Sequence, residues 1–227
     1  MLYIISGDDT ASSRQKLLDL VGGEKNVTRI DGKKQGVVDI EMSLASSGLF
    51  SEKKKVIVEF FSKIKAQDKL ADEVSKVVKD SDLDVILWDE NAPGVKLTKI
   101  TGVNILSYTF PKLYFQFLDG LSPSNPSLLK LFHQVLKSYV AEQVLFSVVK
   151  RLRQLMIVKG GNYQEFSEFK NAQAWQIGKL QKQASLWSEE GLRQAFVDYS
   201  GLEEKMKTSM LTMDLADHLD ILLMGDL

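Results

Sequence analysis

The turn after the first predicted strand is where a nucleotide phosphate would bind. It runs from Gly7 through Asp8 and Asp9 into a helical segment. A working phosphate loop has the pattern G-x-x-x-x-G-K-S/T, because its glycines let backbone N–H groups surround the phosphates and its lysine neutralises them. Gly7 fits this pattern, but the second glycine, the lysine and the magnesium-binding hydroxyl are replaced by Ser12, Ser13 and Arg14. We therefore expect a turn whose acids suit the start of the next helix.

Acidic residues at two strand ends resemble magnesium ligands. Asp89 and Glu90 follow a hydrophobic run, as the metal-binding acid of a nucleotide hydrolase does, and Glu59 ends another such run. Without a phosphate loop neither acid has a nucleotide to serve, and acids are common where strands end in solvated loops. We expect a surface role for them. A divergent P-loop nucleotide hydrolase or kinase stays open as the enzyme alternative.

Composition excludes several other chemistries. The 227 residues include no Cys and 2 His, so a thiol nucleophile and a cysteine-ligated metal are ruled out. His133 and His218 lack ligand spacing, and we expect no metal and no cofactor. The net charge of −1 gives no overall attraction to nucleic acid. Because no apolar run reaches membrane-spanning length and no signal peptide is visible, a cytoplasmic protein without membrane contact is expected.

The first half of the chain alternates strand and helix patterns. Residues 85–88 form an unbroken apolar run, as a buried central strand does. Such alternation predicts a mostly parallel sheet with helices on both faces, hence an α/β domain over residues 1–110. The predicted strands are residues 2–6, 27–30, 55–61, 84–88 and 103–108, and the predicted helices are residues 12–21, 37–46 and 68–79.

The second half shows only helical periodicity and predicts an all-α domain over residues 111–227. Ser200 and Gly201 predict a helix break, and a second interruption is expected near residues 208–212. Trp175 and Trp187 lie on or near an apolar stripe, so we expect both in the core. The predicted helices are residues 114–121, 128–139, 140–159, 171–187, 189–199 and 202–223.

Two surface features could bind partners. Leu49 and Phe50 stand at a small-residue turn before the basic run 53–55, and one of them could be exposed as an anchor for a hydrophobic pocket. Both could equally tuck under the sheet. Residues 130–159 carry six basic side chains against one acid, which could face DNA phosphates or an acidic subunit or simply be solvated. The candidate contacts are Lys150, Arg151, Arg153 and Lys159.

The order of these features resembles the delta-subunit family of bacterial DNA polymerase III clamp loaders. Residues 4–9 are similar to the strand and Gly-acid turn that open its AAA+-like domain, which lacks a working phosphate loop. Residues 48–59 are similar to its Leu-Phe pair, followed by a basic residue and a hydrophobic strand. In the family this pair wedges into a hydrophobic pocket of the sliding clamp and helps to open the ring. The resemblance implies that role for Leu49 and Phe50.

The C-terminal half resembles the helical collar domain of the same family. Residues 117–121 and 128–131 look like its first helices, and residues 144–159 look like its R-x-L-L-x-x-K helix. Ala174-Trp175 stands where a Pro-aromatic pair is usual, with Lys179-Leu180 and Trp187-Ser188 after it. Residues 203–208 resemble the closing D-x-x-I-K-S/T segment. One departure is large, because the family's small lid domain between the two parts is missing.

The resemblance implies a clamp-loader subunit that is not an enzyme by itself. Its expected partners are the sliding clamp, other clamp-loader subunits and primed DNA within the assembly. Besides the enzyme alternative, a stand-alone DNA-binding or scaffold protein derived from such a subunit stays open. Salt-sensitive DNA binding through Arg151 and Arg153, without clamp affinity, would favour that last alternative.

Overall fold

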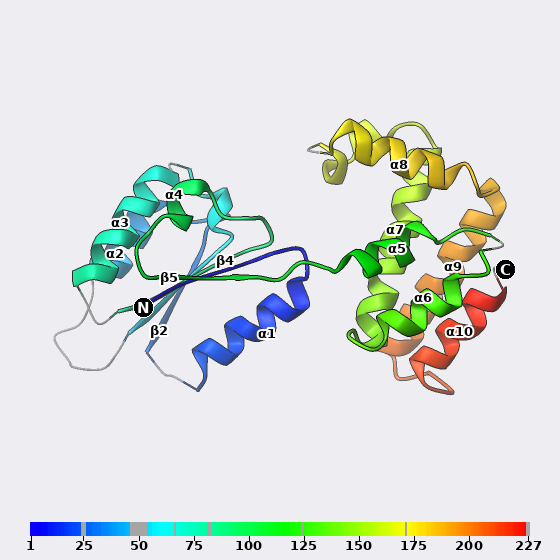
Figure 1. The fold of residues 1–227 in the computed structure, drawn as a ribbon, viewed down its shortest axis with the longest axis horizontal. Coiled ribbons are helices and arrows are strands. Elements are labelled where there is room, and N and C mark those ends of the chain that lie inside the picture. Colours follow the sequence, from blue (N-terminus) through cyan, green and yellow to red (C-terminus); the bar gives the residue numbers. More distant parts are fainter. Residues whose placement is uncertain are drawn as a thin grey trace. The chain divides into compact units, whose positions relative to one another are not determined.

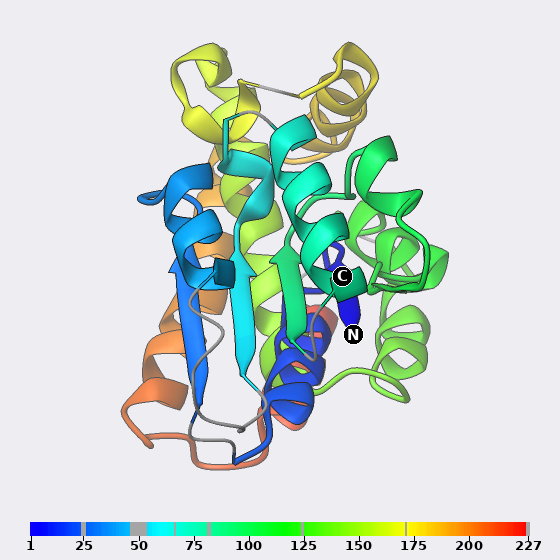
Figure 2. The same ribbon diagram turned by 90° about the vertical axis from the view of Figure 1, so that its left-hand side faces the viewer.

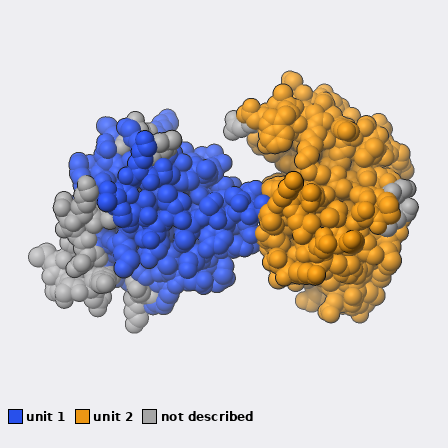
Figure 3. All heavy atoms as spheres, viewed as in Figure 1, with its two compact units in different colours: residues 1–110 blue, residues 111–227 orange. Residues whose placement is uncertain are grey.

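The computed structural model describes residues 1–23, 26–45, 54–65, 67–80, 83–123, 125–170 and 172–225. The chain divides into two compact units, Met1–Phe110 and Pro111–Leu227 (Figure 3). The first is α/β and the second is helical, so the predicted fold class is confirmed. None of the helices in these described ranges combines the length and the apolar character needed to cross a membrane.

Unit 1 is built on a five-stranded parallel sheet in the order β2-β3-β4-β1-β5. Strand β1 lies between β4 and β5, with Leu2 opposite both Val85 and Val103. The apolar runs of β1, β3 and β4 suit strands that are covered on both faces. The strands are β1 (Leu2–Ser6), β2 (Val27–Asp31), β3 (Lys55–Glu59), β4 (Asp84–Asp89) and β5 (Val103–Ser107).

Helices cover both faces of this sheet (Figures 1 and 2). Helix α1 (Thr10–Val21) covers one face, where Leu17 packs with Ile57 and Trp88. The other face carries a larger core and three helices, which are α2 (Val37–Ala45), α3 (Gln67–Asp80) and α4 (Val95–Thr98). The sequence did not predict α4, because four residues are too few to show helical periodicity.

Strand β3 is shorter than predicted. Residues 55–61 were expected to be extended, but the strand ends at Glu59 and Phe60 adopts a left-handed backbone, with φ 54°. This turn starts a short 3-10 helix, η1 (Phe61–Lys63), and places Phe61 in the core. A bulky residue with positive φ is a strained conformation that the surrounding structure must hold in place.

Unit 2 is a helical unit centred on α7 (Ala141–Lys159), which contacts α5, α8, α9 and α10. Its buried residues recur at helical spacing, from Val144 and Leu145 to Val158. Two 3-10 helices, η2 (Tyr163–Glu165) and η3 (Ser167–Phe169), follow it. The other helices are α5 (Lys112–Asp119), α6 (Leu128–Val135), α8 (Ala174–Ala184), α9 (Glu189–Lys207) and α10 (Leu215–Gly225).

Two predictions for unit 2 are wrong. Helix α9 runs without a break through Ser200 and Gly201, because Tyr199 and Leu202 stay in the buried face and the Ser200 hydroxyl donates to the Phe196 carbonyl, 2.6 Å away. The interruption predicted near residues 208–212 is confirmed, because α9 ends at Lys207. The second wrong prediction concerns a tryptophan. Trp175 is 68% exposed at the start of α8, whereas Trp187 is buried as predicted.

Candidate functional site

The carboxyl edge of the sheet between β1 and β4 is where a nucleotide would bind in a doubly wound α/β unit. Strand β1 leads to α1 on one face, and β4 leads to α4 on the other. Connections that leave adjacent strands in opposite directions open a crevice at their carboxyl ends. Ser6 and Asp89 are the paired residues at this edge, and both are buried.

The Gly7 turn lies against the segment that follows β5. Gly7 has φ 133°, and a Cβ at this position would lie 1.9 Å from the Tyr108 carbonyl oxygen. The Asp9 N–H donates to that same oxygen at 3.0 Å, and Asp8 accepts a 3.0 Å hydrogen bond from the Phe110 N–H. A turn held in this way does not present its backbone N–H groups around a ligand as a phosphate loop does.

Asp9 occupies the N-terminus of α1. Its carboxylate accepts hydrogen bonds from the Ser12 N–H at 3.1 Å and from the Ser12 hydroxyl at 2.8 Å. A helix N-terminus attracts anions through its unpaired N–H groups and its dipole. Here the chain supplies that anion itself, as the acidic turn predicts.

Trp88 fixes the residue that stands in place of the phosphate-loop lysine. Its indole N–H donates to the Ser13 hydroxyl at 3.1 Å, and the Ser13 hydroxyl lies 3.1 Å from the Thr10 carbonyl. Ser13 is buried under the sheet edge. A lysine at this position would have to bury its ammonium group beside an indole N–H, another donor.

Asp89, one of the acids that resemble magnesium ligands, is a buried structural acceptor rather than the surface acid that we expected. Its carboxylate accepts the backbone N–H of Ser62 at 2.7 Å and that of Asn91 at 2.9 Å. The Asn91 side-chain amide adds a third bond at 3.0 Å. These donors tie the end of β4 to η1 and explain why the buried carboxylate is tolerated.

Glu59, the acid at the end of β3, joins two arginines. Its two oxygens accept hydrogen bonds from Arg14 at 2.8 Å and from Arg29 at 3.0 Å. Arg14, which stands where a phosphate loop has its metal-binding hydroxyl, also stacks with its guanidinium carbon 3.9 Å from the Trp88 ring centroid. At the carboxyl edge where a nucleotide would bind, these polar side chains are therefore bonded to other groups of the protein. Across the described ranges, no three His, Asp or Glu side chains come together as a metal site requires.

Leu49 and Phe50, the predicted clamp-binding pair, lie outside the described residues. The chain is described up to Ala45, at the end of α2, and again from Lys54, just before β3. The Lys54 ammonium donates to the Ser43 carbonyl in α2 at 2.8 Å. Lys55 likewise donates to the Leu20 carbonyl in α1. Both lysines thus bond carbonyls near helix C-termini, where the dipole favours a cation.

The four basic residues predicted to contact DNA or a subunit occupy different environments. Lys150 and Arg153 lie on the exposed side of α7, and Arg153 pairs with Glu168 at 3.3 Å. Arg151 and Lys159 are turned into unit 2 and are bonded there. A helical wheel alone does not separate them, because Arg151 lies at the border of the apolar stripe.

A polar network around Asp119 and Gln183 joins α5, α7 and α8. Arg151, with 13% of its side chain exposed, donates to Asp119 at 2.9 Å and to Gln183 at 3.0 Å. Lys179 forms a second ion pair with Asp119. The Gln183 amide then donates to the Leu118 carbonyl at 2.7 Å. Each of these polar groups has a partner within the network, which makes the packing of these helices specific.

Trp187 and Lys159 extend the same network. The Trp187 indole N–H donates to the Leu121 carbonyl at 3.2 Å, and Lys159 donates to the Trp187 carbonyl at 2.8 Å and to that of Ala184 at 3.3 Å. The segments that carried the sequence resemblance, around Asp119, Arg151 to Lys159, Lys179 and Trp187, therefore meet in one place. Their shared role was not visible in the sequence, because they are spread over α5, α7, α8 and the turn after α8.

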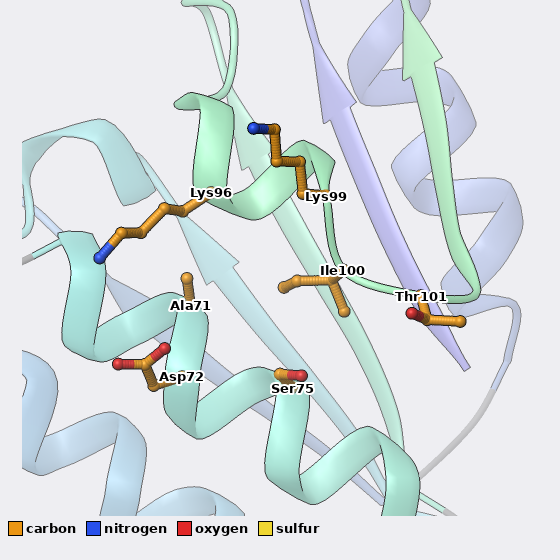
Figure 4. Close-up of a pocket in the computed structure, with 7 residues that line it drawn as sticks. All are labelled: Ala71, Asp72, Ser75, Lys96, Lys99, Ile100 and Thr101. Atoms are coloured by element: carbon orange, nitrogen blue, oxygen red, sulfur yellow. The ribbon is translucent and has the colours of Figure 1, made fainter.

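A shallow pocket lies between α3 and α4, on the opposite face of the sheet from α1 (Figure 4). Lys96 and Lys99 extend their ammonium groups in different directions, and the Ser75 and Thr101 hydroxyls lie apart from both (Figure 4). Polar groups that do not converge on one point do not form a catalytic constellation. The lining residues are Ala71, Asp72, Ser75, Lys96, Lys99, Ile100 and Thr101.

Comparisons with known proteins give similarity at the level of solved structures. No family model matches the sequence, and no match is found among curated proteins. A gamma subunit-related protein of DNA polymerase III from Thermotoga maritima is similar with a TM-score of 0.35 and 15% identity, over 99% of this chain and 93% of that one. A DNA clamp loader delta protein from Bacillus subtilis is similar with a TM-score of 0.44 and 14% identity, over 99% of this chain and 94% of that one.

Proposed function

We propose that the chain is a non-catalytic clamp-loader subunit of DNA polymerase III, which binds the sliding clamp and helps to open it during DNA replication. Unit 1 would present Leu49 and Phe50 to a hydrophobic pocket of the clamp. Unit 2 would pack with other clamp-loader subunits. ATP bound elsewhere in the assembly would supply the energy, so the work of this chain would be stronger binding to the open clamp than to the closed one.

The observation that carries the non-catalytic part is the carboxylate of Asp9 at the N-terminus of α1. It occupies the place where a hydrolase binds the phosphates of its nucleotide. Asp89 is engaged by three N–H donors at the same edge. The enzyme alternative makes a different prediction, namely ATP turnover that is lost in Asp89→Asn.

The C-terminal network supports the clamp-loader part over the stand-alone alternative. Arg151 and Lys159 resemble the charged residues of a collar helix, and both are bonded inside unit 2. A DNA-binding surface on α7 would need these cations on the outside, to contact phosphates. Their inward position leaves Lys150 and Arg153 as the exposed members of the predicted set.

Binding to the purified sliding clamp tests the proposal. Leu49→Ala combined with Phe50→Ala should weaken clamp binding roughly 30-fold or more, because losing a hot-spot side chain costs about 2 kcal/mol. Leu186→Ala combined with Val197→Ala removes two exposed apolar side chains from unit 2 and serves as the matched control. Unchanged affinity in the Leu49/Phe50 variant, with its melting temperature also unchanged, would sink the proposal.

A further inference from the structure

A cluster of cations and aromatic rings lies beside the carboxyl edge of the sheet between β1 and β4 and has no part in the proposed function. Its centre is Phe60, the residue with a left-handed backbone between β3 and η1. The Lys33 ammonium lies 3.4 Å from the centroid of the Phe60 ring, and the Arg14 guanidinium lies 5.8 Å from it. The Trp88 ring meets Phe60 edge-on, with centroids 5.2 Å apart.

The cluster is positively charged. Arg14, Arg29 and Lys33 come from three elements, namely α1, β2 and the turn after β2. Glu59 is the acid that pairs with both arginines, and its side chain is 17% exposed. Asp31 beside Lys33 pairs with Lys34 at 3.8 Å, and these two charges cancel. Two positive charges are therefore left over, and Lys33, which is exposed, carries one of them at the surface. This charge stands out in a chain whose net charge is −1.

The backbone of Phe60 is held in its strained form from two sides. Its N–H donates to the Trp88 carbonyl at 2.8 Å, and its carbonyl accepts from the Lys63 N–H at 2.9 Å. Such conformations cluster at binding sites, where the strain positions a side chain. Here the strain keeps a half-buried aromatic ring at the carboxyl edge of a parallel sheet, the edge at which α/β proteins bind ligands.

From this arrangement we infer that Arg29, Lys33 and Phe60 form a binding site for phosphate esters. The cations would neutralise the phosphate, and the ring would stack against a base once the flexible Lys33 side chain swings off its face. The ligand is the phosphate of a nucleotide or of a single-stranded polynucleotide. The site lies next to the lost phosphate-loop position and does not depend on clamp binding.

Fluorescence anisotropy with a labelled oligothymidylate tests this site. Arg29→Gln combined with Lys33→Gln should weaken binding about tenfold at low salt, and it should reduce the slope of log K against log salt by roughly 1.4, since each single-strand phosphate contact contributes about 0.7. The matched control is Lys182→Gln combined with Arg193→Gln, which removes two exposed cations from unit 2, one of them an arginine paired with a glutamate as Arg29 is. The control should bind within about twofold of the parent protein.

Additional arms identify the ligand and guard against misfolding. An affinity that rises with oligonucleotide length points to a polynucleotide as the ligand. ATP binding as tight as oligonucleotide binding points to a nucleotide. Either result supports the site. If Arg29→Gln with Lys33→Gln does not fold, Lys33→Gln alone should weaken binding about threefold, because it removes one surface charge. The inference would be overturned if the variant bound the oligonucleotide as tightly as the parent protein, or if the control variant lost as much affinity. It would also be overturned if polyglutamate displaced the labelled oligonucleotide as well as unlabelled oligonucleotide does.

Discussion

The indole N–H of Trp88 donates a hydrogen bond to the hydroxyl of Ser13 at 3.1 Å, and both side chains are buried. Ser13→Ala removes the acceptor and leaves a buried donor unpaired. We expect the free energy of unfolding to fall by about 1–3 kcal/mol. Urea denaturation measures it.

A double-mutant cycle with Trp88→Phe supplies the control for this pair. If Ser13 stabilises the protein through this hydrogen bond, Ser13→Ala should lower the free energy of unfolding much less in the Trp88→Phe background. Equal costs in both backgrounds would show that Ser13 acts through another contact.

Gly7 is expected to tolerate no side chain. Its φ of 133° is a conformation that other residues rarely adopt, and an added Cβ would lie 1.9 Å from the Tyr108 carbonyl oxygen. Gly7→Ala should lower the free energy of unfolding by about 3 kcal/mol or more. Gly178→Ala, where a Cβ meets open space on α8, is the control and should be neutral or stabilising. A mild effect at Gly7 in thermal unfolding would contradict the close approach to Tyr108.

Gly201 lies inside α9 rather than at a helix end, so Gly201→Ala should stabilise the protein. A Cβ at this position meets no described atom within 4 Å. Replacing glycine by alanine within a helix is worth about 0.5–1 kcal/mol, mainly through the entropy of the unfolded chain. Denaturant titration should show a higher midpoint with an unchanged m-value. A destabilised variant would instead support the helix break that the sequence predicted.

Arg151 and Arg153 lie two residues apart on α7, and replacing them should lower the free energy of unfolding by very different amounts. Arg151→Met leaves Asp119 with Lys179 as its remaining cation and removes a donor from Gln183, so it should cost about 3 kcal/mol. Arg153→Met breaks a pair whose arginine side chain is 53% exposed and should cost less than about 0.5 kcal/mol. Circular-dichroism melts of the two variants measure the difference. Similar costs would mean that the network around Asp119 does not hold α7 in place.

The strands of unit 1 could be predicted because their residue types are decisive. Residues 85–88 are apolar throughout and include branched side chains, which suits a strand with two covered faces. The end of β3 could not be predicted. Phe60 and Phe61 continue the hydrophobic pattern, and the contacts of Phe60 with Trp88 and Lys33, which accompany the turn, join residues far apart in the sequence.

Unit 2 shows the limits of local signals. Ser200-Gly201 is a strong helix-breaking pair in isolation, but packing of the buried face of α9 against α7 overrides it. The predicted exposure of Arg151 and of Trp175 is wrong in opposite directions. Arg151 bonds Asp119 and Gln183 inside the unit, whereas Trp175 is largely exposed. The outcome at such border positions depends on other helices.

The position of β1 between β4 and β5 in the sheet has a consequence for biosynthesis. Its neighbours begin at Asp84 and Val103, so β1 leaves the ribosome long before either partner strand exists. At about 5–20 residues per second, the wait for β4 is roughly 4 to 17 seconds. During that time an apolar strand has no edge to pair with, and chaperones that bind extended hydrophobic segments have a target.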